Sequence, residues 1–294
     1  MILQSFRPML ACPVEKWDNE GNKLHGKENL LFPLFATPKI DGIRAISQFN
    51  QIVSRKLLPI PNRYVQACLK GVAPGLDGEL YIPGKTFHEI QSAIMSEDGD
   101  PDFRFLVFDK VDSGYYVDRV KEAEKAIEGL QRCNILSPIF IGNIQQLETY
   151  EEQCIKSGYE GVCLRAGNSP YKYGRSTFKE HFLLKLKTFE DAEAVIVGFE
   201  ELYQNCNEAI VDELGHTKHS NHQVNLIPRD KLGSLVVSSK WGEFKIGSGF
   251  TDLQRYNIWS NKNYWLDKTI TFKYQPFGTK DKPRCPIFKG LRYD

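Results

Sequence analysis

The chain has 294 residues, of which 41% are hydrophobic and 26% are charged, and its formal net charge at pH 7 is +1. This length is sufficient for one large domain or for two domains of ordinary size, and the composition is typical of a soluble globular protein. A nearly neutral net charge does not exclude a nucleic-acid-binding protein, because basic residues can be concentrated on one face.

The cysteines and the apolar segments indicate a location. The seven cysteines are scattered and include no CxxC pair, so we expect reduced thiols in an intracellular compartment rather than disulfides or a zinc site. The first ten residues have no long apolar core, so we expect no signal peptide. No apolar run approaches the roughly 20 residues of a membrane helix, so we expect no membrane association.

Strand and helix patterns alternate in the first part of the chain. The predicted strands are short apolar runs next to turn residues, at 36–40, 43–49, 75–83, 103–111, 159–166 and 182–188. The predicted helices each have an apolar face, at 86–96, 118–133 and 147–158. This mixture predicts an α+β domain.

Local sequence signals add detail to these predictions. Thr86 and Glu89 have the spacing of a capping box at a helix N-terminus, and Gly158 is a helix C-cap. The continuous apolar run at 103–111 predicts a strand buried on both faces. Asp41-Gly42 predicts a turn between the first two strands.

The pattern changes after about residue 190. Short β runs separated by glycine and polar turns follow, at 191–201, 233–239, 242–249 and 269–276. This spacing predicts a small all-β barrel of the OB type. We therefore expect two domains, at 1–189 and 190–294.

One polar segment, residues 203–231, interrupts the predicted barrel. Loops longer than about 12–15 residues are uncommon in compact domains and are usually functional or disordered. This insertion is polar and carries Lys218, His219 and Arg229.

Lys39 lies in the stretch "FATPKIDGIRAISQ". Taken alone, Lys39 is better explained as a solvated lysine beside a hairpin turn than as a nucleophile. Other residues that could do chemistry also have structural explanations: Glu79 and Arg55 as a salt bridge, Phe108 as a core residue, and Lys185 with Lys187 as the solvated face of a strand. Their order along the chain distinguishes the alternatives.

That order resembles the motifs of ATP-dependent DNA ligases of the minimal viral and phage type, in the covalent nucleotidyltransferase superfamily. The resemblance covers essentially the whole chain and rests on "KIDGIR" (39–44), "SRKLLPIPN" (54–62), "LDGELY" (76–81), "FLVFDKVD" (105–112), "EGVCLR" (160–165), "YKYGRSTFKEHFLLKLK" (171–187) and, with greater drift, "KDKPRCPIFKGLR" (280–292). It implies an ATP-grasp-like nucleotidyltransferase domain with antiparallel-rich sheets and helices, followed by the OB-fold domain.

The resemblance also implies a role for each matched residue. Lys39 would accept AMP, and Arg44, Lys185 and Lys187 would act with it in catalysis. Glu79 would bind the ribose, Phe108 would stack on adenine, and Thr37 would contact the adenine edge. The remaining nucleotide contacts would come from Arg55, Glu160 and Arg175.

Metal and DNA contacts complete the expected site. Glu160 and Asp41 would hold Mg²⁺, for which Mn²⁺ would substitute. Arg44 and Arg55 would fork onto phosphate oxygens, including those of a nick. The insertion at 203–231 resembles the DNA-binding latch of minimal viral ligases. The last motif would contribute pyrophosphate contacts, from Arg284, Lys289 and Arg292.

An unperturbed lysine has a pKa near 10.4, so Lys39 must lose a proton before it can attack ATP, and neighbouring cations and burial would lower its pKa. Arg44, Lys185 and Lys187 would supply such cations. Two basic segments would supply phosphate contacts and make binding dependent on salt: 172–188 has five basic residues and one acidic residue, and 268–292 has seven and one.

These observations predict a monomeric ligase that encircles nicked duplex DNA and acts in replication, repair or recombination. It would work in the cytoplasm of a host or virus-infected cell, or in the nucleus. The alternatives are an RNA ligase or an mRNA-capping guanylyltransferase of the same superfamily, and a non-catalytic DNA-binding module.

Overall fold

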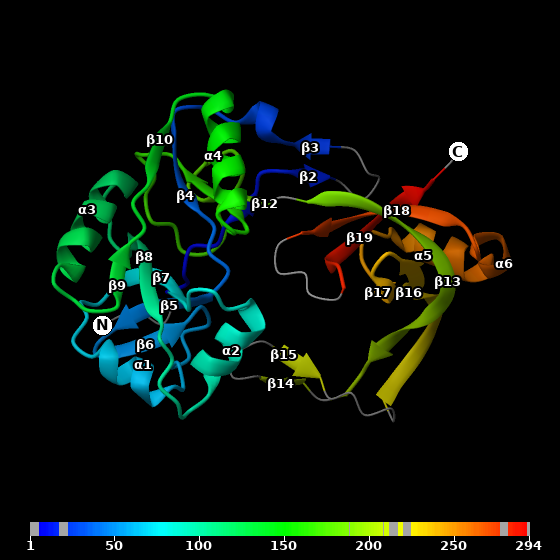
Figure 1. Cartoon of the computed structure of the whole chain (residues 1–294), viewed down its shortest axis with the longest axis horizontal. Helices are drawn as coiled ribbons and strands as arrows, with labels where there is room; N and C mark the ends of the chain where they lie inside the picture. Colours follow the sequence, from blue (N-terminus) through cyan, green and yellow to red (C-terminus); the bar gives the residue numbers. More distant parts are fainter. Residues whose placement is uncertain are drawn as a thin grey trace. The chain divides into compact units, whose positions relative to one another are not determined.

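The computed structural model describes residues 6–17, 23–187, 189–207, 209–211, 217–219, 225–276 and 282–292. For residues 209–211 and 217–219 only the backbone is described. The chain divides into two units (Figure 1), of which the first ends at Lys187 and the second follows it. This division lies two residues before the boundary that the sequence predicts at 189/190.

The first unit contains two five-stranded sheets. The strands of the first sheet are, in spatial order, β1 (Cys12–Pro13), β12 (Leu184–Lys187), β11 (Gly161–Arg165), β4 (Leu34–Pro38) and β10 (Ile139–Ile141). Those of the second are β6 (Gln51–Ser54), β5 (Ile43–Gln48), β7 (Leu76–Tyr81), β8 (Arg104–Lys110) and β9 (Cys133–Ile135). Only the β1–β12 and β8–β9 pairs of these sheets are parallel, so the predicted antiparallel character is confirmed.

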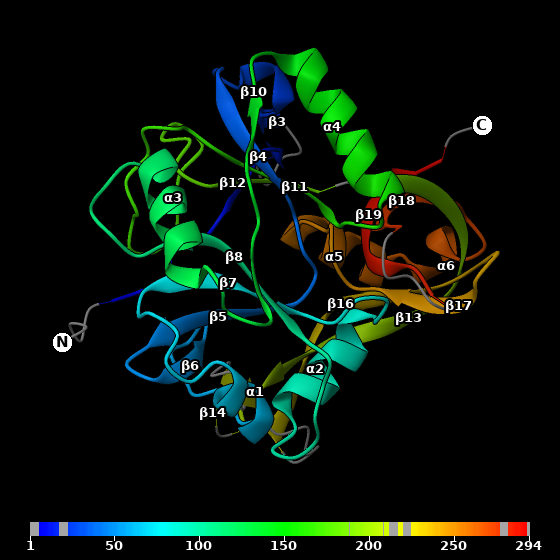
Figure 2. The ribbon, with the colours of Figure 1, turned by 60° about the vertical axis from the view of Figure 1, so that its left-hand side comes forward.

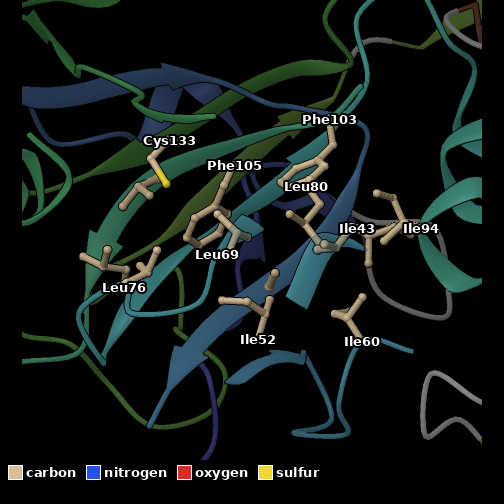
Figure 3. Packing of buried hydrophobic residues seen from close by; sticks show 14 of the residues in the cluster. Ile43, Ile52, Ile60, Leu69, Leu76, Leu80, Ile94, Phe103, Phe105 and Cys133 are labelled. Atoms are coloured by element: carbon tan, nitrogen blue, oxygen red, sulfur yellow. The ribbon is translucent and has the colours of Figure 1, made fainter. Parts of the chain in front are cut away.

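Four helices cover these sheets. α1 (Arg63–Cys68), α2 (Phe87–Met95) and α3 (Tyr116–Ile127) pack on the second sheet, and α4 (Ile144–Lys156) packs on the first (Figures 1 and 2). The second sheet and its helices share one apolar core, shown in Figure 3, to which Leu80, Phe103 and Phe105 contribute. The unit also has a short hairpin of β2 (Lys16–Trp17) and β3 (Lys23–His25), followed by a 3₁₀ turn at Lys27–Asn29.

The local helix signals are confirmed. Thr86 and Glu89 form a capping box at the start of α2. Gly158, just after α4, has a φ of 82°, the left-handed conformation for which glycine is suited.

Strand β8 differs from its prediction. Its residues alternate between buried and half-buried positions, so β8 is not buried on both faces. Phe105 and Val107 point into the helix-covered core, whereas Phe108 lies on the opposite face and lines a pocket. An apolar residue that lines a pocket gives the same sequence signal as one that is packed in a core.

The segment 39–42 also differs from its prediction. Strand β4 belongs to the first sheet and β5 to the second, so Asp41-Gly42 is a connection between sheets and not a hairpin turn. Gly42 lies against β7, where an added Cβ would be 2.4 Å from the carbonyl oxygen of Leu80. The glycine therefore permits close packing of this connection against the second sheet.

The second unit is built on one five-stranded antiparallel sheet. Its strands are, in spatial order, β17 (Gly242–Ile246), β16 (Leu226–Ser239), β13 (Glu190–Asn205), β18 (Thr269–Gln275) and β19 (Arg284–Leu291). The two edges meet at a bridge between Ser248 and Ile287, which closes the sheet into a barrel. Between β17 and β18 the chain forms α5 (Asp252–Ser260) and α6 (Lys262–Trp265). The second unit therefore contains two helices, whereas the sequence predicts an all-β barrel. A Thr251–Gln254 capping box starts α5.

The predicted insertion begins within paired strands. β13 and β16 continue beyond the barrel and stay paired as far as Asn205 and Leu226. Beyond them lie β14 (Ala209–Val211) and β15 (Thr217–His219), which pair with each other. The segment is therefore an extension of two barrel strands.

We expect Gly42→Ala to lower the free energy of unfolding by about 2 kcal/mol, because a methyl group in a filled site forces a backbone shift. Gly114→Ala is the matched control, since its added Cβ would approach only Arg119 Cγ, at 3.9 Å. Urea unfolding of the two variants tests this, and equal stability would show that the connection can relax around a side chain.

Candidate active site

A pocket of about 230 Å³ lies in the first unit, between residues of both sheets. Its lining includes eight residues that the sequence analysis assigned to nucleotide binding: Thr37, Lys39, Arg44, Arg55, Glu79, Phe108, Arg175 and Lys185. Asp41, Glu160 and Lys187 lie outside the lining. The structure thus brings together residues that are nearly 150 positions apart in the sequence.

Lys39 follows the end of β4 and is fixed to β11 by its backbone. Its N–H donates to the carbonyl of Gly161 at 2.8 Å, and its carbonyl accepts from the N–H of Glu160 at 3.1 Å. Its ammonium forms an ion pair with the Glu160 carboxylate, and Glu160 forms a second ion pair with Lys187. This buried carboxylate therefore joins two lysines at the edge of the pocket.

The charge on Lys39 is stabilised by its partner. Burial is the largest single influence and would lower the pKa of Lys39, but Glu160, with smaller contributions from Cys163 and Glu79, raises the pKa above its usual value. Burial likewise opposes ionisation of Glu160, and Lys39 and Lys187 hold its pKa below its usual value. From the sequence, neighbouring cations and burial are expected to lower the pKa of Lys39, whereas here neighbouring anionic groups, Glu160 above all, raise it.

Lys185 has the opposite environment. Burial and the neighbouring charges of Lys187, Lys39 and Arg175 all lower its pKa. The described part of the site therefore contains two lysines, Lys39 and Lys187, that share a carboxylate, and a third, Lys185, surrounded mainly by cations.

Arg44 is held by a buried carboxylate. Its Nε and Nη2 atoms donate to Asp77 Oδ1 and Oδ2, each at 2.6 Å, and Asp77 is fully buried. Burial opposes the charged form of Arg44, but Asp77 raises its pKa overall. Asp77 occupies the Nε and Nη2 side of the guanidinium, so the expected fork from Arg44 onto phosphate oxygens is not available from that side in this arrangement.

Sequence reasoning missed a second buried ionic group beside the pocket. Asp109 accepts from Arg119 Nε at 2.8 Å and forms an ion pair with Arg165, which lines the pocket. The guanidinium carbons of Arg165 and Arg44 lie 5.8 and 5.0 Å from the centre of the Phe108 ring. The available signal was a charged residue within each of three apolar strands: Asp77, Asp109 and Arg165.

Glu79 lies on β7, opposite Arg44 on β5. Burial and the negative charges of Asp77 and Asp41 outweigh the cations Lys39 and Arg44, and raise the pKa of Glu79 to about 7. A carboxyl group with this pKa is partly protonated near neutral pH, so it can donate as well as accept hydrogen bonds.

The residues predicted in the second unit have different surroundings. Lys289 and Arg292 form ion pairs with Asp191 and Glu193, at alternating positions of β13. Arg284 is half-buried on β19, and Arg229 is exposed on β16. Lys218 and His219 belong to β15, and their side chains lie outside the described residues.

Comparison with known proteins identifies the fold and the family. The profile of the DNA ligase OB-like domain matches residues 228–292, within the second unit. The DNA ligase of Haemophilus influenzae is 27% identical over 257 residues, which cover 85% of this chain and 83% of that protein. The Chlorella virus DNA ligase-adenylate structure is 34% identical, with a TM-score of 0.55, and the match covers 97% of this chain and 99% of that one.

The chain belongs to the DNA ligase family.

The fold comparison extends further. The ligase superposes on a Lig E DNA ligase with a TM-score of 0.72 over 97% of its own length and 99% of that chain, at 23% identity. The prediction of a nucleotidyltransferase domain followed by an OB-fold domain is therefore confirmed. Among the described residues of the ligase, no helix combines the length and the apolar character that crossing a membrane requires. All seven cysteines are free thiols.

The pKa of Glu79 gives a stability prediction for the ligase. A carboxyl whose pKa is raised from 4.5 to about 7 on folding stabilises the folded state fully below pH 4.5, and this contribution is lost as the pH rises through 7. We therefore expect Glu79→Gln to raise the free energy of unfolding at pH 8 by up to about 3 kcal/mol. The gain shrinks as the pH falls toward 4.5.

Urea unfolding between pH 5 and pH 8 measures this difference. Glu148→Gln is the control, because Glu148 is exposed on α4 and should change stability little at any pH. A stability gain for Glu79→Gln that does not vary with pH would contradict the proposed protonation of Glu79.

Proposed function

We propose that this ligase uses ATP to seal nicks with a 3′-hydroxyl and a 5′-phosphate in duplex DNA, through an AMP bound covalently to Lys39. The observation that carries the proposal is the pocket itself. It combines a lysine, an aromatic face, a carboxyl group and several cations within one cavity of about 230 Å³. The adenylate named in the Chlorella virus structure supports the choice of nucleotide.

The described side chains suit an adenine nucleotide. Phe108 offers an aromatic face for adenine, Thr37 also lines the pocket, and Glu79 can bind ribose hydroxyls through its carboxyl group. Arg55, Arg175 and Lys185 can contact the phosphates. These cations also offset the charge of the transferring phosphoryl group, whose transfer depends mainly on positioning and electrostatics.

The proposed ligation reaction has three steps. First, the deprotonated Nζ of Lys39 attacks the α-phosphorus of ATP; a P–N bond forms, the P–O bond to the β-phosphate breaks, and pyrophosphate leaves. Second, an oxygen of the 5′-phosphate attacks the same phosphorus, and Lys39 leaves. Third, the 3′-hydroxyl loses its proton and attacks the 5′-phosphate, and AMP leaves as the phosphodiester forms.

The carboxylates fit a hydrated magnesium ion better than one enclosed by protein. Within the described ranges, no cluster of three or more His, Cys, Asp or Glu residues could hold a metal. Mg²⁺ commonly takes one or two carboxylates together with waters and substrate phosphates, which Glu160 and Asp41 can complete. When bound, Mg²⁺ supplies positive charge beside the phosphates, and Mn²⁺ should substitute for it. Glu160 would hold the ion only by exchanging an ion pair with Lys39 or Lys187.

The segment 203–231 supports a DNA-binding role for the second unit. Its paired strands extend beyond the barrel, and Arg229 is exposed on one of them. Lys218, His219 and Arg229 would contact phosphates as this latch closes around the duplex, with one ligase monomer per nick. Such contacts make binding dependent on salt. A ligase with this activity would act in DNA replication, repair or recombination inside a cell.

Three alternatives make different predictions. An mRNA-capping guanylyltransferase would take GMP from GTP. In the proposed ligase, Phe108 stacks on adenine and Lys39 accepts AMP from ATP. An RNA ligase would prefer nicked RNA to nicked DNA. A non-catalytic DNA-binding module would form no covalent nucleotide. Assays with labelled ATP or GTP and with nicked DNA or RNA separate these possibilities.

Intact mass spectrometry after incubation with ATP and Mg²⁺ should show one added AMP, which peptide mapping places on Lys39. Lys39→Ala should form no adduct, because it lacks the attacking nitrogen, and GTP should give none with the wild type. An adduct on Lys39→Ala equal to that of the wild type would refute the proposed nucleophile.

Replacing residues 206–225 with Asn-Gly would join Asn205 to Leu226, which are already paired, through a two-residue hairpin turn. We expect the affinity for nicked DNA to fall about tenfold as phosphate contacts are lost. AMP transfer to Lys39 should remain nearly unchanged, since the pocket lies in the first unit, and it serves as the internal control. Equal loss of both activities would contradict a DNA-binding latch.

A further inference from the structure

The N-terminal segment, Phe6–Val14, forms part of the active-site wall, although no family motif includes it. Leu10 and Ala11 line the pocket. Met9 is fully buried in an apolar cluster with Ile46 of β5 and Tyr171. The carbonyl of Ala11 accepts a hydrogen bond from Arg175 Nη1 at 2.8 Å.

Met9, Tyr171, Asp77 and Arg44 form a closed ring of hydrogen bonds. The Met9 N–H donates to the Tyr171 hydroxyl at 3.3 Å, and that hydroxyl donates to Asp77 Oδ2 at 2.6 Å. Asp77 accepts from Arg44 Nε and Nη2, and Nη2 also donates to the Met9 carbonyl at 3.1 Å. Each member is therefore held by two others.

The ring joins separate parts of the unit. Arg44 and Asp77 belong to β5 and β7 of the second sheet, Met9 precedes β1 of the first sheet, and Tyr171 lies between β11 and β12. Asp77 is fully buried and Tyr171 is 8% exposed, so water competes little for these hydrogen bonds. Burial and the Asp77 charge raise the pKa of Tyr171, which keeps its hydroxyl protonated as the donor that the ring requires.

The ring determines which atom of Arg44 is available to a phosphate. Nε and Nη2 are both occupied, and Nη1 makes no hydrogen bond to any residue that the structure describes. A guanidinium held at two nitrogens presents the third in one direction, so little conformational entropy is lost when it binds an oxyanion.

We propose that Tyr171, together with the backbone of Met9, is a positioning residue that fixes Arg44 for contact with a phosphate during ligation. This inference rests on the proposed function, because it assigns Arg44 a phosphate of the nucleotide or of the nick. Tyr171 itself touches no reacting atom. It acts through Asp77 and Arg44, and its loss leaves both the guanidinium and the Met9 amide less restrained.

Single-turnover nick sealing and AMP transfer to Lys39 test the proposal. Tyr171→Phe should slow the step in which Arg44 acts by about tenfold, the size expected from losing one hydrogen bond to a charged group. Tyr173→Phe is the matched control: Tyr173 lies in the same segment and packs on Phe6, but it is 54% exposed and its hydroxyl makes no hydrogen bond within the described chain. Its rates should stay within about twofold of the wild type.

The decisive comparison uses Arg44→Ala as a background. If Tyr171 acts through Arg44, Tyr171→Phe should cause no further slowing once the guanidinium is absent. Equal slowing in both backgrounds would indicate a general structural role, and no slowing in either would show that the ring is unimportant; each result overturns the proposal. If Tyr171→Phe folds poorly, Asp77→Asn takes its place. It should slow the reaction in the wild-type background and cause no further slowing in the Arg44→Ala background.

The result for the wild type distinguishes a failure of the proposed function from a failure of the role assigned to Tyr171. An enzyme that forms no lysyl-AMP would refute the proposed function, and this inference with it. An active wild type with the wrong double-mutant pattern refutes only the role of Tyr171.

Discussion

The Glu160 carboxylate joins Lys39 to Lys187, and the active site depends on this three-residue charge arrangement. One negative charge is buried between two ammonium groups that would otherwise repel each other. Removing a buried carboxylate from its partners leaves uncompensated charge, which is among the more destabilising changes a protein can undergo. Glu160 therefore links the position of Lys39 to the register of β11 against β12, where Gly161 pairs with Lys187.

The same principle recurs under the pocket. Asp77 and Asp109 are opposite each other on β7 and β8, and both are fully buried. Each carboxylate has a guanidinium partner beside it, Arg44 for one and Arg119 with Arg165 for the other. The pocket thus lies over alternating charges whose positions are set by the strand pairing. Phe108 lies next to two of these guanidinium groups, so its ring is restrained by electrostatics as well as by packing.

The sequence predicted the composition of the site well and its connections poorly. Eight of the expected nucleotide-binding residues line one pocket, and six of them lie on or directly follow a strand that the sequence predicts. Arg55 follows β6 and Arg175 lies between β11 and β12, so the motif order alone indicated these two. The ion pairs could not be predicted, since nothing in the sequence indicates that Asp77 would take two nitrogens of Arg44. The Asp41-Gly42 connection was mistaken for a hairpin turn because turn chemistry is local, whereas the sheet to which each flanking strand belongs is decided by distant residues. The helices after β17 were missed although Thr251 and Gln254 carried a capping signal.

The ion pairs of Lys289 with Asp191 and of Arg292 with Glu193 have a consequence for catalytic turnover. Both pairs are about half exposed, and such pairs contribute only about 0–1 kcal/mol to stability. A phosphate that approaches either cation competes with a carboxylate already in place, so the exchange replaces one anion with another at little net cost. Each exchange leaves the displaced carboxylate to water, which solvates it well because these pairs are about half exposed. An enzyme that must leave its product after every reaction benefits from such readily reversible contacts.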